Sequence, residues 1–217
     1  GHYARIERCA DGVCRLCTAE SVARDQSYML YRLGRDILDR LILPLGEFEK
    51  ADVREIAHDI DLRCADAPDS MEICFIPDGD YAAWLEARGF STQPGDFVDK
   101  DGRVLAQHGG IHRYTLGQGR GLGVSGPHRY YVSAIRPETN QVVLSDGSDL
   151  GKSVVFCSDP NWIGVEGLDG PLEGTVRLRH SRTELPATLS PAGDGVRLDM
   201  ADPARAPTPG QLAVFYL

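Results

Sequence analysis

The chain has 217 residues, of which 42% are hydrophobic and 25% are charged, so it can bury a core in one or two domains. Its formal net charge of -9 argues against a protein that binds nucleic acid by bulk attraction, although a few clustered Arg or Lys side chains still suffice for phosphate contacts. No apolar run approaches the roughly 20 residues of a membrane span, and no signal-peptide pattern opens the chain. We therefore expect a cytoplasmic protein whose six cysteines are thiols.

Helical patterns occupy the first part of the sequence. Apolar residues recur at three- and four-residue spacing from Ser21 to about Asp61, with a break at Pro44 to Gly46. The part from Glu49 to Asp61 is predicted to be a separate helix. The run "ICFI", which ends at Ile76, has the length of a strand, and "DGDYAAWLEARGF" reads as a capped helix that ends at Gly89.

Strand patterns follow from about residue 93 onward. Three stretches of alternating residues are each interrupted by a turn and predict hairpins over residues 96–108, 130–146 and 187–200, with turns at Asp101-Gly102, Glu138 to Asn140 and Asp194-Gly195. Strands at this spacing favour a small antiparallel barrel or sandwich. Both ends of the sequence fall within strand-like or turn-like stretches, so we expect the chain to be a fragment.

Three motifs carry candidate chemistry. Cys9, Cys14 and Cys17 have the spacing C-x4-C-x2-C, which is compatible with zinc or an iron–sulfur cluster, but a second ligand pair at short spacing is absent and free thiols are favoured. The glycine-rich stretch around Arg120 lacks the Lys-Ser/Thr pair of a phosphate-binding P-loop and predicts a tight structural loop. Cys74 in "ICFI" reads, by itself, as a buried core residue or as a reactive thiol before a helix start.

Six blocks of sequence resemble one family. They are "GHYARI", "RDQSYMLYRL", "LPLGEFEKADVREIA", "DSMEICFI", "GGIHRYTLGQGRGLGV" and "TPGQLAVFY", and their order and spacing are similar to those of the tRNA-specific 2-thiouridylases, which place sulfur on the wobble uridine of tRNA. The resemblance implies the α/β end of a PP-loop ATP-pyrophosphatase domain over 1–75, a central domain over 76–130 and an antiparallel β-barrel over 131–217, incomplete at its end. The family's S-G-G-x-D-S loop and its early catalytic cysteine have no match in this chain.

The resemblance assigns the central chemistry to Cys74. The family cysteine at this position takes up sulfur as a persulfide and delivers it to the activated uridine, and a thiolate is the form that carries sulfur. ATP, with Mg²⁺, would adenylate the uridine C2 oxygen so that AMP can leave. The implied partners are tRNA and a sulfur-donor protein that carries a persulfide. No metal-binding residue is predicted, and the fragment alone is expected to be inactive.

The resemblance also assigns binding residues. Gly1 matches a position that lines the nucleotide, where a close backbone approach favours glycine. The positions that match tRNA contacts are His2, Arg24, Asp25, Gln26, Arg179, His180 and Gln211. We expect Arg177, Arg179 and Arg182 to form a local basic patch in this otherwise acidic chain.

Some features depart from the family pattern and leave alternatives open. Gly119 stands where the family usually has Arg, so any phosphate contact there falls to Arg120, and Asp66-Ala67-Pro68 replaces a segment that often carries Lys. The alternatives are a non-catalytic RNA-binding module, a metal or iron–sulfur protein, and another cysteine-persulfide sulfurtransferase. The sequence does not identify the tRNAs, the sulfur donor or the oligomeric state.

Overall fold

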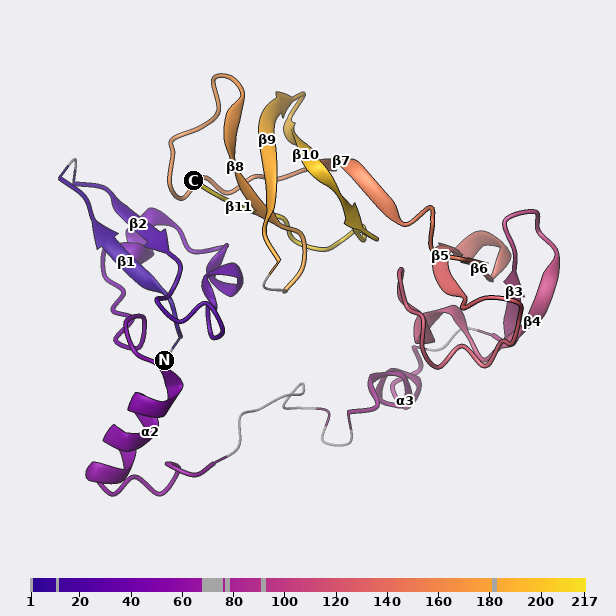
Figure 1. Ribbon diagram of the computed structural model, residues 1–217, viewed down its shortest axis with the longest axis horizontal. Helices are drawn as coiled ribbons and strands as arrows, with labels where there is room; N and C mark the ends of the chain where they lie inside the picture. The colour runs from indigo at the N-terminus through magenta and orange to yellow at the C-terminus, as the bar shows by residue number, and fades with distance from the viewer. Residues whose placement is uncertain (1, 11, 68–75, 77–78, 91–92, 181–182) are drawn as a thin grey trace. The chain divides into compact units, whose positions relative to one another are not determined.

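The structure, a computed structural model, describes residues 2–10, 12–67, 76, 79–90, 93–180 and 183–217 (Figure 1). The chain divides into two compact units. Unit 1 comprises Gly1–Pro68, Ser153–Pro203 and Gly210–Leu217, and unit 2 comprises Asp69–Lys152 and Ala204–Pro209. Within the described ranges, no helix has both the length and the apolar character that crossing a membrane requires.

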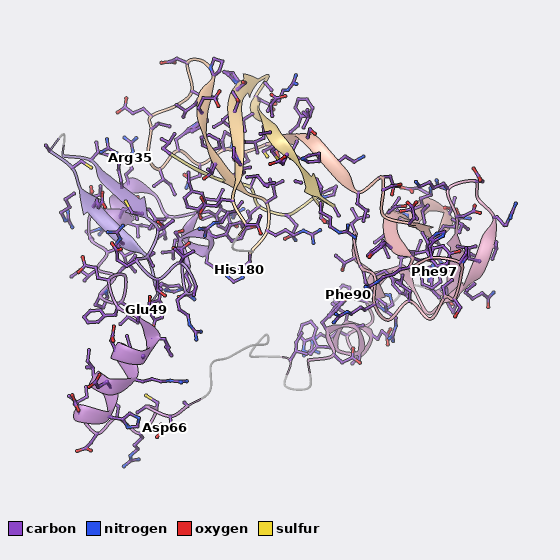
Figure 2. The ribbon with its side chains drawn as sticks, viewed as in Figure 1. Arg35, Glu49, Asp66, Phe90, Phe97 and His180 are labelled. Atoms are coloured by element: carbon purple, nitrogen blue, oxygen red, sulfur yellow. The ribbon has the colours of Figure 1, made fainter. Side chains whose placement is uncertain are left out.

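The N-terminal part of unit 1 is a hairpin followed by short helices. Strands β1 and β2 pair antiparallel, and the elements of this part are β1 (Arg5–Arg8), β2 (Cys14–Cys17), the 3-10 helix η1 (Ser27–Leu30), α1 (Arg35–Leu38) and α2 (Lys50–Asp59). The prediction of a helix after Glu49 is confirmed. Glu49 and Asp52 form a reciprocal capping box, in which Glu49 N donates to Asp52 Oδ2 over 3.1 Å (Figure 2).

The helical pattern that begins at Ser21 predicted more helix before Pro44 than the structure contains. Only one turn of 3-10 helix and one turn of α-helix form between Ser21 and Pro44. The Asp25 carboxylate accepts hydrogen bonds from backbone N–H groups of Ala19 and Ser27, and such local bonds compete with helical ones. Gly34, in an extended conformation, then separates the two short helices.

The C-terminal part of unit 1 is a five-stranded sheet in the order β11-β8-β9-β10-β7 (Figure 1). Its strands are β7 (Gly151–Cys157), β8 (Leu172–Arg177), β9 (Leu185–Ala192), β10 (Gly195–Arg205) and β11 (Val214–Tyr216). Alternate residues of β10, namely Val196, Leu198 and Met200, are buried, as expected for a strand with one face on a core. The predicted hairpin of β9 and β10 is confirmed.

Unit 2 begins with a short helix and continues into a four-stranded sheet in the order β4-β3-β6-β5. Its elements are α3 (Tyr81–Glu86), β3 (Gly95–Val98), β4 (Val104–His108), η2 (Ile111–Arg113), β5 (Tyr131–Arg136), η3 (Pro137–Thr139) and β6 (Gln141–Ser145). The hairpins predicted over residues 96–108 and 130–146 are confirmed as the pairs β3–β4 and β5–β6. Strands β3 and β6 also pair with each other, in parallel. The predicted cap of α3 is also present, because Ala83 N donates to Asp80 Oδ1 over 2.9 Å.

The core of unit 2 lies on this sheet. Phe97, Val132, Val142 and Leu144 are at most 1% exposed and form one buried cluster. The ring of Phe97, which is labelled in Figure 2, meets those of His108 and Tyr114 edge-on. The ring centroids of His108 and Tyr114 lie 5.2 and 5.0 Å from that of Phe97. The loop before β5 packs on this core through partly buried Leu116, Leu122 and Val124.

Candidate nucleic-acid interface

Two of the predicted site residues, Cys74 and Gly1, lie outside the described residues. So does Arg182, which was expected to belong to the basic patch. The structure does describe His2, Arg24, Asp25, Gln26, Arg179, His180 and Gln211, all of which belong to unit 1. These residues define the candidate interface.

The loop before η1 is fixed by side-chain contacts to the start of the chain. Gln26 Oε1 accepts a hydrogen bond from Tyr3 N over 3.0 Å, and Gln26 N donates to Tyr3 O over 2.7 Å. This two-way contact brings Gln26 next to His2, the exposed residue before Tyr3. Two predicted tRNA contacts that are far apart in sequence therefore lie close together.

Asp25 has the most buried carboxylate of this loop, with 1% of its side chain exposed. Its Oδ1 accepts from the backbone nitrogens of Ala19 and Ser27, over 2.9 and 3.3 Å. Its Oδ2 accepts from Ser27 Oγ over 2.8 Å and forms an ion pair with Nη1 of Arg177. Asp25 therefore holds the loop in place from inside, while its neighbour Arg24 is exposed.

Arg177, the last residue of β8, joins two carboxylates. Its side chain is 5% exposed, and its Nε donates to Glu184 Oε1 over 3.0 Å, in addition to the ion pair with Asp25. Its guanidinium carbon lies 4.8 Å from the ring centroid of Tyr216. Burial opposes the charge, but the hydrogen bonds that Arg177 donates to Asp25 and Glu184 outweigh it and raise the pKa of Arg177.

The prediction that Arg177 belongs to a surface basic patch is therefore wrong. A guanidinium that pairs with two carboxylates and is only 5% exposed has almost no accessible surface to offer a phosphate. Arg177 and Arg179 are two residues apart and would share one face of a continuous strand, but β8 ends at Arg177, so the strand pattern does not extend to Arg179. Arg179, two residues further on and past the end of β8, is half-buried.

Tyr28 brings the third predicted segment to the same place. Its hydroxyl donates to Leu212 O over 3.0 Å, next to the exposed Gln211. Its ring meets the ring of His180 edge-on, with centroids 6.0 Å apart; His180 itself is exposed (Figure 2). Ser27 Oγ and Tyr216 Oη, 3.0 Å apart, add a second link to β11.

The three predicted segments thus meet around a centre in which buried Arg177 pairs with two carboxylates. Sequence reasoning missed Ser27, Tyr28, Glu184 and Tyr216 as parts of this centre, and it placed Arg177 in a surface patch. Their partners lie up to 189 residues away along the chain, so no local pattern marks them. What the arrangement offers to a ligand is an exposed rim of His2, Arg24, His180 and Gln211, whose donors suit phosphate and base edges.

The cysteine motif of the hairpin does not form a ligand set. Cys14 and Cys17 are three residues apart in β2, so their side chains point to opposite faces of the strand. A hydrogen bond to Asp39 raises the pKa of the Cys14 thiol, and burial raises that of Cys17. Among the described residues, no three His, Cys, Asp or Glu side chains are grouped so that they could hold a metal ion.

Comparison with protein families first defines the class of this chain. Residues 1–78 match the model described as "tRNA methyl transferase HUP domain", residues 85–146 match "tRNA methyl transferase PRC-barrel domain", and residues 152–217 match "Aminomethyltransferase beta-barrel domain". The predicted succession of a nucleotide-binding domain, a central domain and a β-barrel is confirmed. The three matches follow one another along the chain and together cover most of it.

Curated relatives then identify the family. The chain is 44% identical to the tRNA-specific 2-thiouridylase MnmA of Carboxydothermus hydrogenoformans over 219 residues, 43% identical to that of Heliobacterium modesticaldum, and 38% identical to that of Geobacter metallireducens. All of this chain is covered in each case, and 60%, 57% and 59% of the respective relative. The chain belongs to the tRNA-specific 2-thiouridylase family and spans about 60% of the length of the curated relatives that it matches.

Proposed function

We propose that this chain is part of a tRNA 2-thiouridylase, a cytoplasmic enzyme that replaces the C2 oxygen of the wobble uridine with sulfur. The observation that carries the proposal is the identity of about 40% to proteins named as such, over the whole chain. The structure brings three predicted tRNA-contact segments together around Arg177. This supports the proposal, because one bound RNA could contact all three segments at once.

The sulfur step is assigned to Cys74. Its thiolate would take a sulfane sulfur from a donor protein, and the terminal sulfur of the resulting persulfide would attack C2 of the activated uridine and displace AMP. The thiol of the family's early catalytic cysteine, which has no match in this chain, would then attack the Cys74 sulfur, break the S–S bond to free the uridine sulfur, and form a disulfide with Cys74. ATP would supply the activation by adenylating the C2 oxygen, with Mg²⁺ neutralising the polyphosphate. Of this chain's residues only Gly1 is assigned to the nucleotide, so the chain's own contribution is the sulfur carrier and the RNA contacts.

The RNA contacts are divided between two roles. Exposed His2, Arg24, His180 and Gln211 would touch the tRNA directly, and half-buried Arg179 would join them from the end of β8. Asp25 and Gln26, whose side chains accept hydrogen bonds from within the protein, would position Arg24. The proposed domains are 1–75, 76–130 and 131–217.

The test uses the full-length protein in a strain that depends on it for thiolation. Cys74→Ser is expected to abolish 2-thiouridine, because an oxygen cannot carry sulfane sulfur, whereas adenylation and tRNA binding persist. Cys64→Ser, which changes an exposed thiol, is the matched control and is expected to leave thiolation intact. Mass spectrometry of the tRNA separates exchange of oxygen for sulfur from addition of a methyl group.

Three outcomes would support another function. Normal 2-thiouridine with Cys74→Ser would make Cys74 a core residue. A modification that appears as an added methyl group would favour the transferase activity named in two of the family models. Sulfur transfer to a partner other than tRNA would favour a different persulfide sulfurtransferase, and RNA binding without modification would favour a binding module.

A further inference from the structure

Tyr131, at the start of β5 in unit 2, has two arginine side chains against its ring. The guanidinium carbon of Arg205 lies 4.6 Å from the ring centroid, and that of Arg129 lies 5.4 Å from it. Both arginines are exposed. Because both guanidinium groups lie close to the same ring, they also lie close to each other. A tyrosine ring attracts each guanidinium through its π face, so the ring gathers two cations at one place.

The backbone around the ring is built to hold this arrangement. A Cβ at Gly119 would lie 2.6 Å from Cδ1 and Cε1 of Tyr131, and one at Gly147 would lie 2.9 Å from Cδ2. Two glycines therefore leave room for the ring between the loops. Arg129 Nε donates to Gly119 O over 3.2 Å, which fixes the arginine against the glycine-rich loop and beside the exposed Arg120.

The charges of this cluster are not balanced by carboxylates. Among the residues that the structure describes, Arg120, Arg129 and Arg205 form no ion pair, in contrast to Arg177 of unit 1 with its two carboxylate partners. The acidic residues that flank Gly147 are engaged elsewhere: Asp146 accepts from Ser148, and Asp149 pairs with Lys100. In a chain of net charge -9, such a cluster of cations points to an anionic partner.

We propose that Arg129 and Arg205 around Tyr131, together with Arg120, form a second RNA-binding surface that contacts phosphodiester groups of the tRNA. The proposal rests on the proposed function for the identity of the RNA. Guanidinium groups bind phosphate through paired N–H donors, and Tyr131 is half-buried among glycines rather than open to a base. The surface would therefore hold the RNA backbone without reading its sequence.

The test measures binding of unmodified tRNA to the full-length protein by fluorescence anisotropy over a series of KCl concentrations. Arg129→Glu/Arg205→Glu is expected to raise Kd at least tenfold at low salt and to reduce the slope of log K against log salt by about 0.7 to 0.9 for each lost phosphate contact. Arg129→Lys/Arg205→Lys keeps both charges but loses the paired N–H donors, so it is expected to raise Kd by less than the Glu pair does and to keep the salt slope of the wild type.

The matched control changes two other exposed arginines of unit 2 that have no ion pair among the described residues. Arg103→Glu/Arg136→Glu gives the same net charge and is expected to leave Kd within about threefold of the wild type. Thermal unfolding of each variant separates loss of binding from loss of folding. The KM for ATP should not change in any of them.

Each result has one meaning. If both Glu pairs weaken tRNA binding equally, only general charge matters and the surface is refuted. If Arg129→Glu/Arg205→Glu weakens ATP binding but not tRNA binding, the cluster is a nucleotide site and the RNA proposal is refuted. If the wild type binds and thiolates tRNA and Arg129→Glu/Arg205→Glu binds it equally well, the second RNA-binding surface is refuted and the proposed function stands. If the wild type binds no tRNA, both the surface and the proposed function are refuted.

Discussion

Replacing Arg177 with Met tests whether the buried ion pair holds the predicted tRNA-contact loop in place. The change removes the partner of Asp25, whose side chain is 1% exposed, and leaves that carboxylate with hydrogen bonds from Ala19 and Ser27 only. Breaking a buried pair costs about 3–5 kcal/mol. Because Glu184 is 33% exposed and can regain water, we expect a loss near the lower end, about 3 kcal/mol in the free energy of unfolding.

Urea unfolding of the 217-residue chain measures this loss. The sequence has two tryptophans, and in a Trp84→Phe background only Trp162, in unit 1, reports on unfolding. Arg197→Met is the matched control. Arg197 pairs with Asp199 in β10, with side chains 46% and 40% exposed, so solvent screens the pair and the expected cost is about 1 kcal/mol or less.

A double-mutant cycle separates the ion pair from other effects of each change. Asp25→Asn keeps an oxygen for the backbone donors but turns an amide toward Arg177, so it should also destabilise unit 1. The double variant Asp25→Asn/Arg177→Met should lose at least about 1 kcal/mol less than the sum of the single losses. Additive losses, or equal losses for Arg177→Met and Arg197→Met, would refute the role of the pair.

Three further predictions concern single sites. Hydrogen bonds from His112 and Arg113 lower the pKa of Glu86 below its ordinary 4.5. Unit 2 should therefore lose stability as the pH falls below about 4.5. Glu86→Gln should remove that part of the pH dependence, which urea unfolding at a series of pH values measures. Gly95→Ala should cost about 1–3 kcal/mol, since its Cβ would lie 2.1 Å from Asn140 O. Urea unfolding followed by Trp84, which lies in unit 2 with Gly95, measures this loss, and a smaller loss would mean that the strands can separate. Iodoacetamide should modify exposed Cys64 before Cys14, whose buried thiol has a raised pKa; mass spectrometry that finds the reverse order would contradict this.

The local signals in the sequence predicted the local structure. The capped helix before Gly89 and the hairpins with turns near Gly102 and Asn140 are present, because caps and turns depend on a few neighbouring residues. The helix expected from Ser21 onward is mostly absent, since Asp25 uses its carboxylate to hold a loop. Periodicity alone does not reveal which polar side chain will compete with helical hydrogen bonds.

The roles that the family resemblance gives to the site residues stay predictions, but the structure shows how several of these residues are held. The family resemblance pointed to three segments, and contacts of Tyr28 and Arg177 do join them in unit 1. The resemblance could not say that Asp25 faces inward while Arg24 faces solvent, because burial is decided by a strand and a loop more than 150 residues apart. The parallel pairing of β3 and β6 was missed for a similar reason, as nothing near either strand specifies it.

Arginines with the same formal charge therefore divide into two groups according to their partners. Arg177 is neutralised by two carboxylates and stacked on Tyr216, so its charge stabilises the fold and contributes little field outside the protein. Arg129 and Arg205 lie against Tyr131 with no carboxylate partner among the described residues, so their charge is directed at solvent. An acidic protein can bind a polyanion in this way, because the field at the contact depends on the unpaired charges nearby and salt screens the more distant acidic ones.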